Sequence, residues 1–87
     1  MPYIKKDARP AIDVLLAPVI KHLQSLPEQE QDGVFNYTIT KIIKNLYPKR
    51  YFHFNRALGV LSAVTHELYR RVIGPYEDEK IRENGDV

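Results

Sequence analysis

The chain has 87 residues, a formal net charge of +2 and no cysteine, and 44% of its residues are hydrophobic. This length fits one domain, and a chain this short buries only about 60% of its unfolded surface, so its stability margin is small. The composition excludes a disulfide framework and a zinc site built on thiolates, and no apolar run approaches the roughly 18 residues of a membrane span. Because the first residues also lack the apolar segment of a signal peptide, we expect a cytoplasmic protein with no membrane partner.

The first predicted helix covers about residues 8–26, where apolar residues recur at spacings of three and four on one face. These residues are Ile12, Leu15, Leu16, Val19, Ile20, Leu23 and Leu26. We expect Asp7 to cap this helix and Pro27 to end it. Pro18 should kink or break it, because proline has no N–H to donate to the Val14 carbonyl.

Residues 28–33 are polar and unpatterned, which predicts a solvated linker with Asp32 as the N-cap of the next helix. The linker resembles the first half of an EF-hand calcium loop. The position that requires a bidentate glutamate is Ile39, however, and we therefore expect no metal. The second helix, about residues 33–47, has one apolar face and should end before Pro48. That face consists of Phe35, Ile39, Ile42, Ile43 and Leu46.

The third predicted helix, about residues 53–73, has the most regular apolar pattern in the chain. The pattern consists of Phe54, Ala57, Leu58, Leu61, Val64, Thr65, Leu68 and Val72. Gly74 should follow its C-terminus, and Pro75 should start a short helix over about residues 76–84 that Gly85 closes. The sequence therefore predicts an all-α fold, a three-helix bundle with a short C-terminal helix or tail, in a single helical domain over residues 1–87.

No catalytic site is evident in the sequence. No two of the three histidines lie three or four residues apart, the four glycines are isolated, and neither serine lies in a nucleophile elbow. The remaining alternative is a weak enzyme that acts on a nucleotide with a catalytic pair drawn from His66, Glu67 and Tyr69, in which Glu67 or His66 is the base. The sequence shows none of the convergent groups that such a site requires. We expect a protein that is not an enzyme and that needs no cofactor.

A second face of the third helix carries small residues. Gly59 and Ala63 lie four residues apart, on the side opposite the apolar pattern. Glycine inside a helix costs about 0.5–1 kcal/mol relative to alanine, and close packing would offset this cost. The packing partner is the first helix, the acidic tail or a second copy of the chain; alternatively, the face forms a ligand floor beside Arg56 and Arg70.

Tyrosine and arginine, which are enriched in binding hot spots, cluster late in the chain. We assign ligand binding to Asn36, Tyr37, Arg56, Arg70, Arg71 and Tyr76, and self-association to Gly59 and Ala63. An alternative is that Arg70 or Arg71 pairs with Glu77 or Asp78 and holds the tail down. A second alternative is nucleic-acid binding by the basic helix 2–3 region. That region consists of Lys41, Lys44, Lys49, Arg50 and Arg56, with Tyr37, Tyr51 and His53 among them.

Several segments together resemble an uncharacterised family of short bacteriophage and bacterial proteins. The most specific are Tyr69-Arg70-Arg71, Pro75-Tyr76-Glu77-Asp78 and Asn84-Gly85-Asp86-Val87. The resemblance implies a phage or mobile-element accessory protein, and it assigns no functional residue. Together with the sequence features, it leads us to expect a non-enzymatic, self-associating protein. Its partner would be an anionic nucleotide-like ligand, such as a host defence signal that it sequesters, or a host protein.

Overall fold

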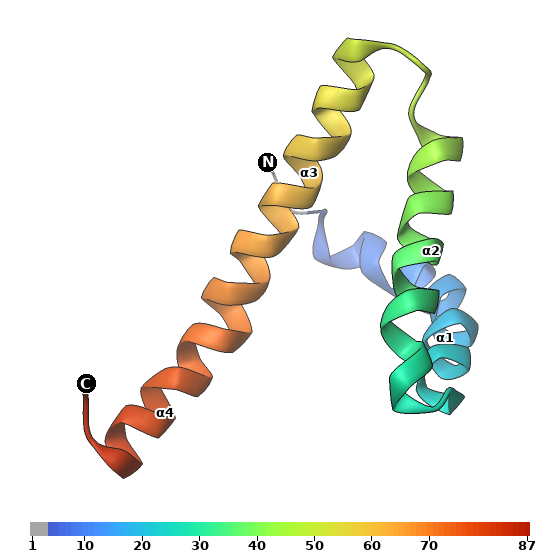
Figure 1. The fold of residues 1–87 in the computed structure, drawn as a ribbon. Coiled ribbons are helices and arrows are strands. Elements are labelled where there is room, and N and C mark those ends of the chain that lie inside the picture. The colour runs from blue at the N-terminus through green and yellow to red at the C-terminus, as the bar shows by residue number, and fades with distance from the viewer. Residues whose placement is uncertain (1–3) are drawn as a thin grey trace. The chain divides into compact units, whose positions relative to one another are not determined.

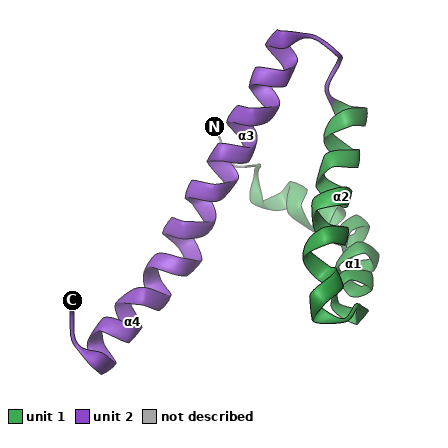
Figure 2. Cartoon of the chain, viewed as in Figure 1, with its two compact units in different colours: residues 1–46 green, residues 47–87 purple. Residues whose placement is uncertain are grey.

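Helices make up most of residues 4–87, which are the part of the chain that the computed structural model describes, and no strand occurs among them. The predicted all-α class is therefore confirmed, and the helical content is consistent with a helical bundle. The chain divides into two units, residues 1–46 and residues 47–87 (Figures 1 and 2). Part of the N-terminal segment that we judged not to be a signal peptide lies outside the described residues. The prediction of a single domain stays a prediction.

Unit 1, residues 1–46, is a pair of helices joined by a tight turn. After a 3-10 turn at Lys6–Ala8 it contains α1, Arg9–Ser25, and α2, Glu28–Leu46. The Gln31 side-chain amide of α2 donates hydrogen bonds to the carbonyls of Leu23, at 3.2 Å, and Leu26, at 3.3 Å. The Leu23 carbonyl also accepts a hydrogen bond from the Leu26 N–H, so the Gln31 amide adds to the capping of α1 and ties the start of α2 to its end.

Two local predictions for unit 1 were wrong, and a third was wrong in part. Ala8, not Asp7, is the N-cap of α1; Pro18 lies inside α1 and does not break it, and a kink there stays a prediction. The expected linker at residues 28–33 is the start of α2, so Asp32 lies within that helix and does not cap it. The acidic residues of this segment explain the difference. Glu28 and Glu30 lie in the first turn of α2, where carboxylates favour the positive end of the helix dipole.

Unit 2, residues 47–87, is dominated by one continuous helical segment. It begins with α3, Tyr51–Leu68, passes through a π turn, Tyr69–Ile73, and ends with α4, Gly74–Asn84 (Figure 1). Gly85 closes α4 as predicted, with a positive φ of 87° that favours glycine. At 1.5 Å per residue, the segment from Tyr51 to Asn84 is about 51 Å long.

The predicted helix end at Gly74 and Pro75 was wrong, because the helix widens there instead of stopping. The Gly74 N–H donates to the carbonyl of Tyr69, five residues earlier, which defines the π turn. Pro75 has no N–H, and its ring would collide with the carbonyl four residues earlier in a regular α-helix. A π turn inserts one residue into the helix, and this extra residue lets the chain pass the proline and continue as α4.

Most apolar side chains of the described residues remain accessible to solvent. Ala57 is the only buried residue among them, at 4% exposure. Large apolar residues of both units are more than a third exposed, including Leu15 and Ile42 in unit 1 and Leu58 and Val72 in unit 2. A stable protein requires further burial of these residues, since burial of apolar surface is the main favourable term in folding and association.

Candidate functional site

The π turn is the most distinctive local structure in unit 2. A Cβ atom placed on Gly74 would lie 3.2 Å from the backbone oxygen of Tyr69, a contact that is tighter than usual for a methyl group. Gly74 is therefore suited to the turn because it lacks a side chain. π turns occur frequently at functional sites, so the geometry directs attention to residues 69–77.

A hydrogen bond spans this turn, from the Tyr69 hydroxyl to the Glu77 carboxylate. Eight residues of a regular α-helix end about 80° out of line, and the extra residue of the π turn brings the two side chains onto one side. The hydrogen bond to Glu77 raises the pKa of the Tyr69 phenol above its ordinary value, and the negative charges of Glu77 and Asp78 act in the same direction. The Tyr69–Glu77 hydrogen bond therefore links the start of the π turn to the first turn of α4, on the exposed surface of the helix.

Apolar residues, most of them exposed, form one line along unit 2, which we call the unit 2 stripe. Its members are Phe54, Ala57, Leu58, Leu61, Val64, Leu68, Val72, Ile73 and Tyr76. From Phe54 to Leu68 the main spacings alternate between three and four, the heptad pattern of a helix that packs lengthwise against another. After Leu68 the spacing is four to Val72 and four again to Tyr76. A spacing of four keeps successive residues on one side of a helix, so the stripe continues through the π turn into α4.

An open pocket of about 590 Å³ lies beside the C-terminal part of unit 2. Its charged lining residues are Glu77, Asp78, Lys80 and Asp86, hence three carboxylates and one ammonium group. None of the six predicted ligand-binding residues lines this pocket. The surplus of carboxylates opposes an anionic ligand, so this pocket is not the site that the sequence suggested.

The six predicted ligand residues do not gather in one place within either unit. Asn36 and Tyr37 belong to α2, and the Asn36 side-chain oxygen accepts a hydrogen bond from Thr40 at 3.4 Å. The other four belong to unit 2. Arg56 and Arg70 are fourteen residues apart on its continuous helical segment, hence about 21 Å along the axis. One nucleotide-sized ligand does not bridge that distance on a single copy.

The unit 2 members of this set have neighbours of their own. The Arg56 guanidinium lies 5.4 Å from the Tyr47 ring centre and donates to His53 Nδ1 at 3.0 Å. Arg70 pairs with both carboxylate oxygens of Glu67 at 3.0 Å. The same contact engages the Glu67 carboxylate, which is one of the candidate catalytic bases of the sequence analysis.

Tyr76 and Lys80 form a further contact one turn into α4. The Lys80 ammonium lies 5.5 Å from the centre of the Tyr76 ring. Such a contact stabilises an exposed site by about 0.5–1 kcal/mol. The Tyr76 side chain is still 56% exposed, so one face of its ring remains accessible to a partner.

Gly59 has open space around it within unit 2, and Ala63 is half-buried. A Cβ atom added to Gly59 would meet no atom within 4 Å, so the C-terminal part of unit 2 does not pack closely there. Self-association through this face stays a prediction. The open surroundings of Gly59 now provide a matched comparison with the crowded Gly74.

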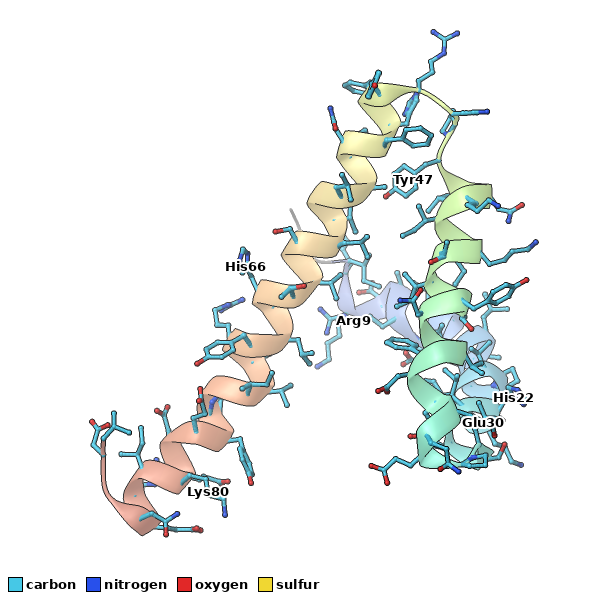
Figure 3. The ribbon with its side chains drawn as sticks, viewed as in Figure 1. Arg9, His22, Glu30, Tyr47, His66 and Lys80 are labelled. Carbon is cyan, nitrogen blue, oxygen red and sulfur yellow. The ribbon has the colours of Figure 1, made fainter. Side chains whose placement is uncertain are left out.

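The histidines belong to helices of both units. His22 lies in α1, and His66 projects from α3 in the other unit (Figure 3). Among residues 4–87, no three His, Asp or Glu side chains are placed to hold a metal ion. Over the same residues, no helix is long and apolar enough to cross a membrane.

The fold and this surface define a class, an all-α protein whose most prominent feature is an exposed amphipathic helical segment. The chain belongs to a family described as a domain of unknown function, DUF6899, whose model matches residues 1–87. The expectation of an uncharacterised family is thus confirmed over the whole chain. No curated protein and no solved structure gives a match.

Proposed function

We propose that this protein is a non-enzymatic accessory protein that works by associating with copies of itself through unit 2. The observation that carries the proposal is the unit 2 stripe. One helical segment cannot bury its own apolar line, and this line is in the heptad register of helices that pack lengthwise. Its aromatic and aliphatic side chains are of the type found at the centre of protein interfaces.

Static light scattering tests self-association directly. The protein should have at least twice the mass of a single chain at micromolar concentration, and the mass should fall on dilution. A mass of one chain at high micromolar concentration would sink the proposal. Far-UV circular dichroism of the same samples separates a folded monomer from an unfolded one.

For the assembled protein we propose an anionic, nucleotide-like ligand, in the setting of a phage or mobile element inside a bacterial cell. Support comes from Arg71 of the π turn, next to the Glu67-paired Arg70, because a guanidinium group pairs with phosphate in a bidentate manner. Calorimetry with cyclic di- and trinucleotides is the test. Arg71→Ala should weaken binding, whereas Arg82→Ala, an exposed arginine of α4, should not. If both variants bind as tightly as the wild type, the ligand binds at another site. If the wild-type protein gives no heat of binding with these nucleotides, a host protein is left as the partner.

Nucleic-acid binding is a second candidate because of the charge at the start of unit 2. Residues 47–66 contain Lys49, Arg50 and Arg56 and no acidic residue, and Tyr51 among them is 86% exposed. Cationic side chains neutralise phosphates, and an exposed ring stacks on bases. Binding to single-stranded DNA or RNA should then weaken steeply with salt. Failure to bind at low salt eliminates this candidate.

A further inference from the structure

The unit 2 stripe is longer than any helix of its own chain that could cover it. The stripe runs from Phe54 to Tyr76, about 33 Å along the helix axis, whereas the seventeen residues of α1 and the nineteen of α2 span about 26 Å and 29 Å. A second unit 2 carries a stripe of the same length, so it can match the first from end to end.

The charged residues of unit 2 are arranged in the opposite order to the one that a helix dipole favours. Its first part, residues 47–66, carries three basic residues and no acidic one, whereas residues 74–87 carry five acidic residues and two basic ones. A helix favours acidic groups at its start and basic groups at its end. The α2 helix follows this rule, with Glu28 and Glu30 at its start and Lys44 at its end. In unit 2 the reversed order costs stability in isolation, and an oppositely directed neighbour would offset it.

We propose that two copies of this chain pair through their unit 2 stripes in antiparallel orientation. This inference rests on the proposed self-association and adds its surface, partner and direction. In the register that sets Leu61 of one copy against Val64 of the other, Phe54 lies opposite Val72. The same register brings the basic start of each copy, around Lys49, to the level of Glu77–Glu79 of the other. Parallel pairing would place like charges together at both ends.

The surface available on each copy suits a stable dimer. Seven large members of the stripe are 39% to 64% exposed: Phe54, Leu58, Val64, Leu68, Val72, Ile73 and Tyr76. At roughly 150–250 Å² for a fully exposed aromatic side chain, and somewhat less for an aliphatic one, they offer on the order of 600 Å² per copy. Standard interfaces bury about 800 Å² per partner, and the flanking polar atoms supply the difference.

Crosslinking measures the direction of pairing, because the chain has no cysteine of its own. Lys49→Cys and Glu79→Cys place single thiols at the two ends of unit 2, outside the stripe. With a short bis-maleimide reagent, the mixture of the two variants should give covalent dimers that contain one of each. Either variant alone should give few. Covalent dimers of each variant with itself, and none that join the two variants in the mixture, would show parallel pairing and overturn the proposal.

A matched pair of substitutions locates the surface. Val64→Glu adds a carboxylate to the stripe, and Ala63→Glu adds the same group one residue away, on the face with Gly59. Val64→Glu should weaken the dimer more than about a hundredfold, because pairing buries two carboxylates without partners, and Ala63→Glu should leave it nearly unchanged. The reverse result would place the interface on the small-residue face and refute this proposal while leaving self-association intact. Single chains in wild-type protein would refute both.

Discussion

The two glycines of unit 2 provide a quantitative test of the π turn. Gly59→Ala adds a methyl group that meets no atom within 4 Å in a regular part of α3. It should stabilise the fold by about 0.5–1 kcal/mol, the usual difference between the two residues inside a helix. Because 1 kcal/mol shifts the Tm of a domain of this size by about 4–8 °C, the expected increase is about 2–8 °C.

Gly74→Ala has the same gain in propensity and an additional cost. Its methyl group would lie 3.2 Å from the backbone oxygen of Tyr69, and this oxygen accepts the hydrogen bond of the π turn. Relief by a bond-angle change of roughly 7° costs about 1 kcal/mol, which cancels the gain. Thermal unfolding followed by circular dichroism, at equal protein concentrations, should show no increase in Tm for Gly74→Ala. If both variants gain equally, the π turn does not constrain Gly74, and our explanation of the continuous helix is wrong.

Three further predictions concern single side chains. The Tyr69 phenol should ionise above the ordinary pKa of about 10, and Glu77→Gln should lower its pKa. The difference in absorbance at 295 nm between wild type and Tyr69→Phe, followed as the pH rises, measures this pKa. A midpoint at or below pH 10 would contradict the hydrogen bond. Because the folded-state pKa is raised, the stabilisation from this pair is present below pH 10 and is lost as the pH rises through the folded-state value. Gln31→Ala should destabilise unit 1 by about 0.5–1.5 kcal/mol in urea unfolding, and the neighbouring exposed Gln29→Ala, which is the control, should have little effect. Pro18→Ala should stabilise α1 by about 2–3 kcal/mol by restoring its missing hydrogen bond; an unchanged unfolding midpoint would show that the solvent or local distortion already satisfies the Val14 carbonyl.

The helices could be predicted from the sequence where their apolar residues repeat at helical spacing. The α1 pattern and the part of the unit 2 stripe from Phe54 to Leu68 were both predicted. The start of α2 was missed for the opposite reason, since residues 28–33 have no apolar pattern. Their carboxylates favour a helix start through the dipole, which a search for apolar periodicity does not detect.

The sequence did not predict that the helix continues through Gly74 and Pro75, because both residues are strong helix breakers. A regular α-helix cannot pass Pro75 without a clash, whereas a widened turn with a residue lacking a side chain at Gly74 can. The signal was present in the spacing. Val72 and Tyr76 follow Leu68 at spacings of four, so the apolar face continues past the two helix breakers.

The candidate site could be predicted from the sequence only in part. Composition shows which residue types are common in binding sites, but it does not show which residues lie close together in the fold. Arg56 and Arg70 belong to the same helical segment, yet about 21 Å of helix separates them. The Tyr69–Glu77 contact could not be read from regular helical spacing, since it depends on the π turn. The exposure of the stripe shifts the centre of the functional surface from the arginines to the apolar line.

Native mass spectrometry of the purified, untagged chain tests the central claim most directly. Association through unit 2 predicts a dominant species with twice the mass of a single chain, and any bound nucleotide would appear as added mass on that species. The dimer should become mostly single chains in Val64→Glu and persist in Ala63→Glu. A spectrum of single chains alone, from wild-type protein sprayed at tens of micromolar, would contradict the account.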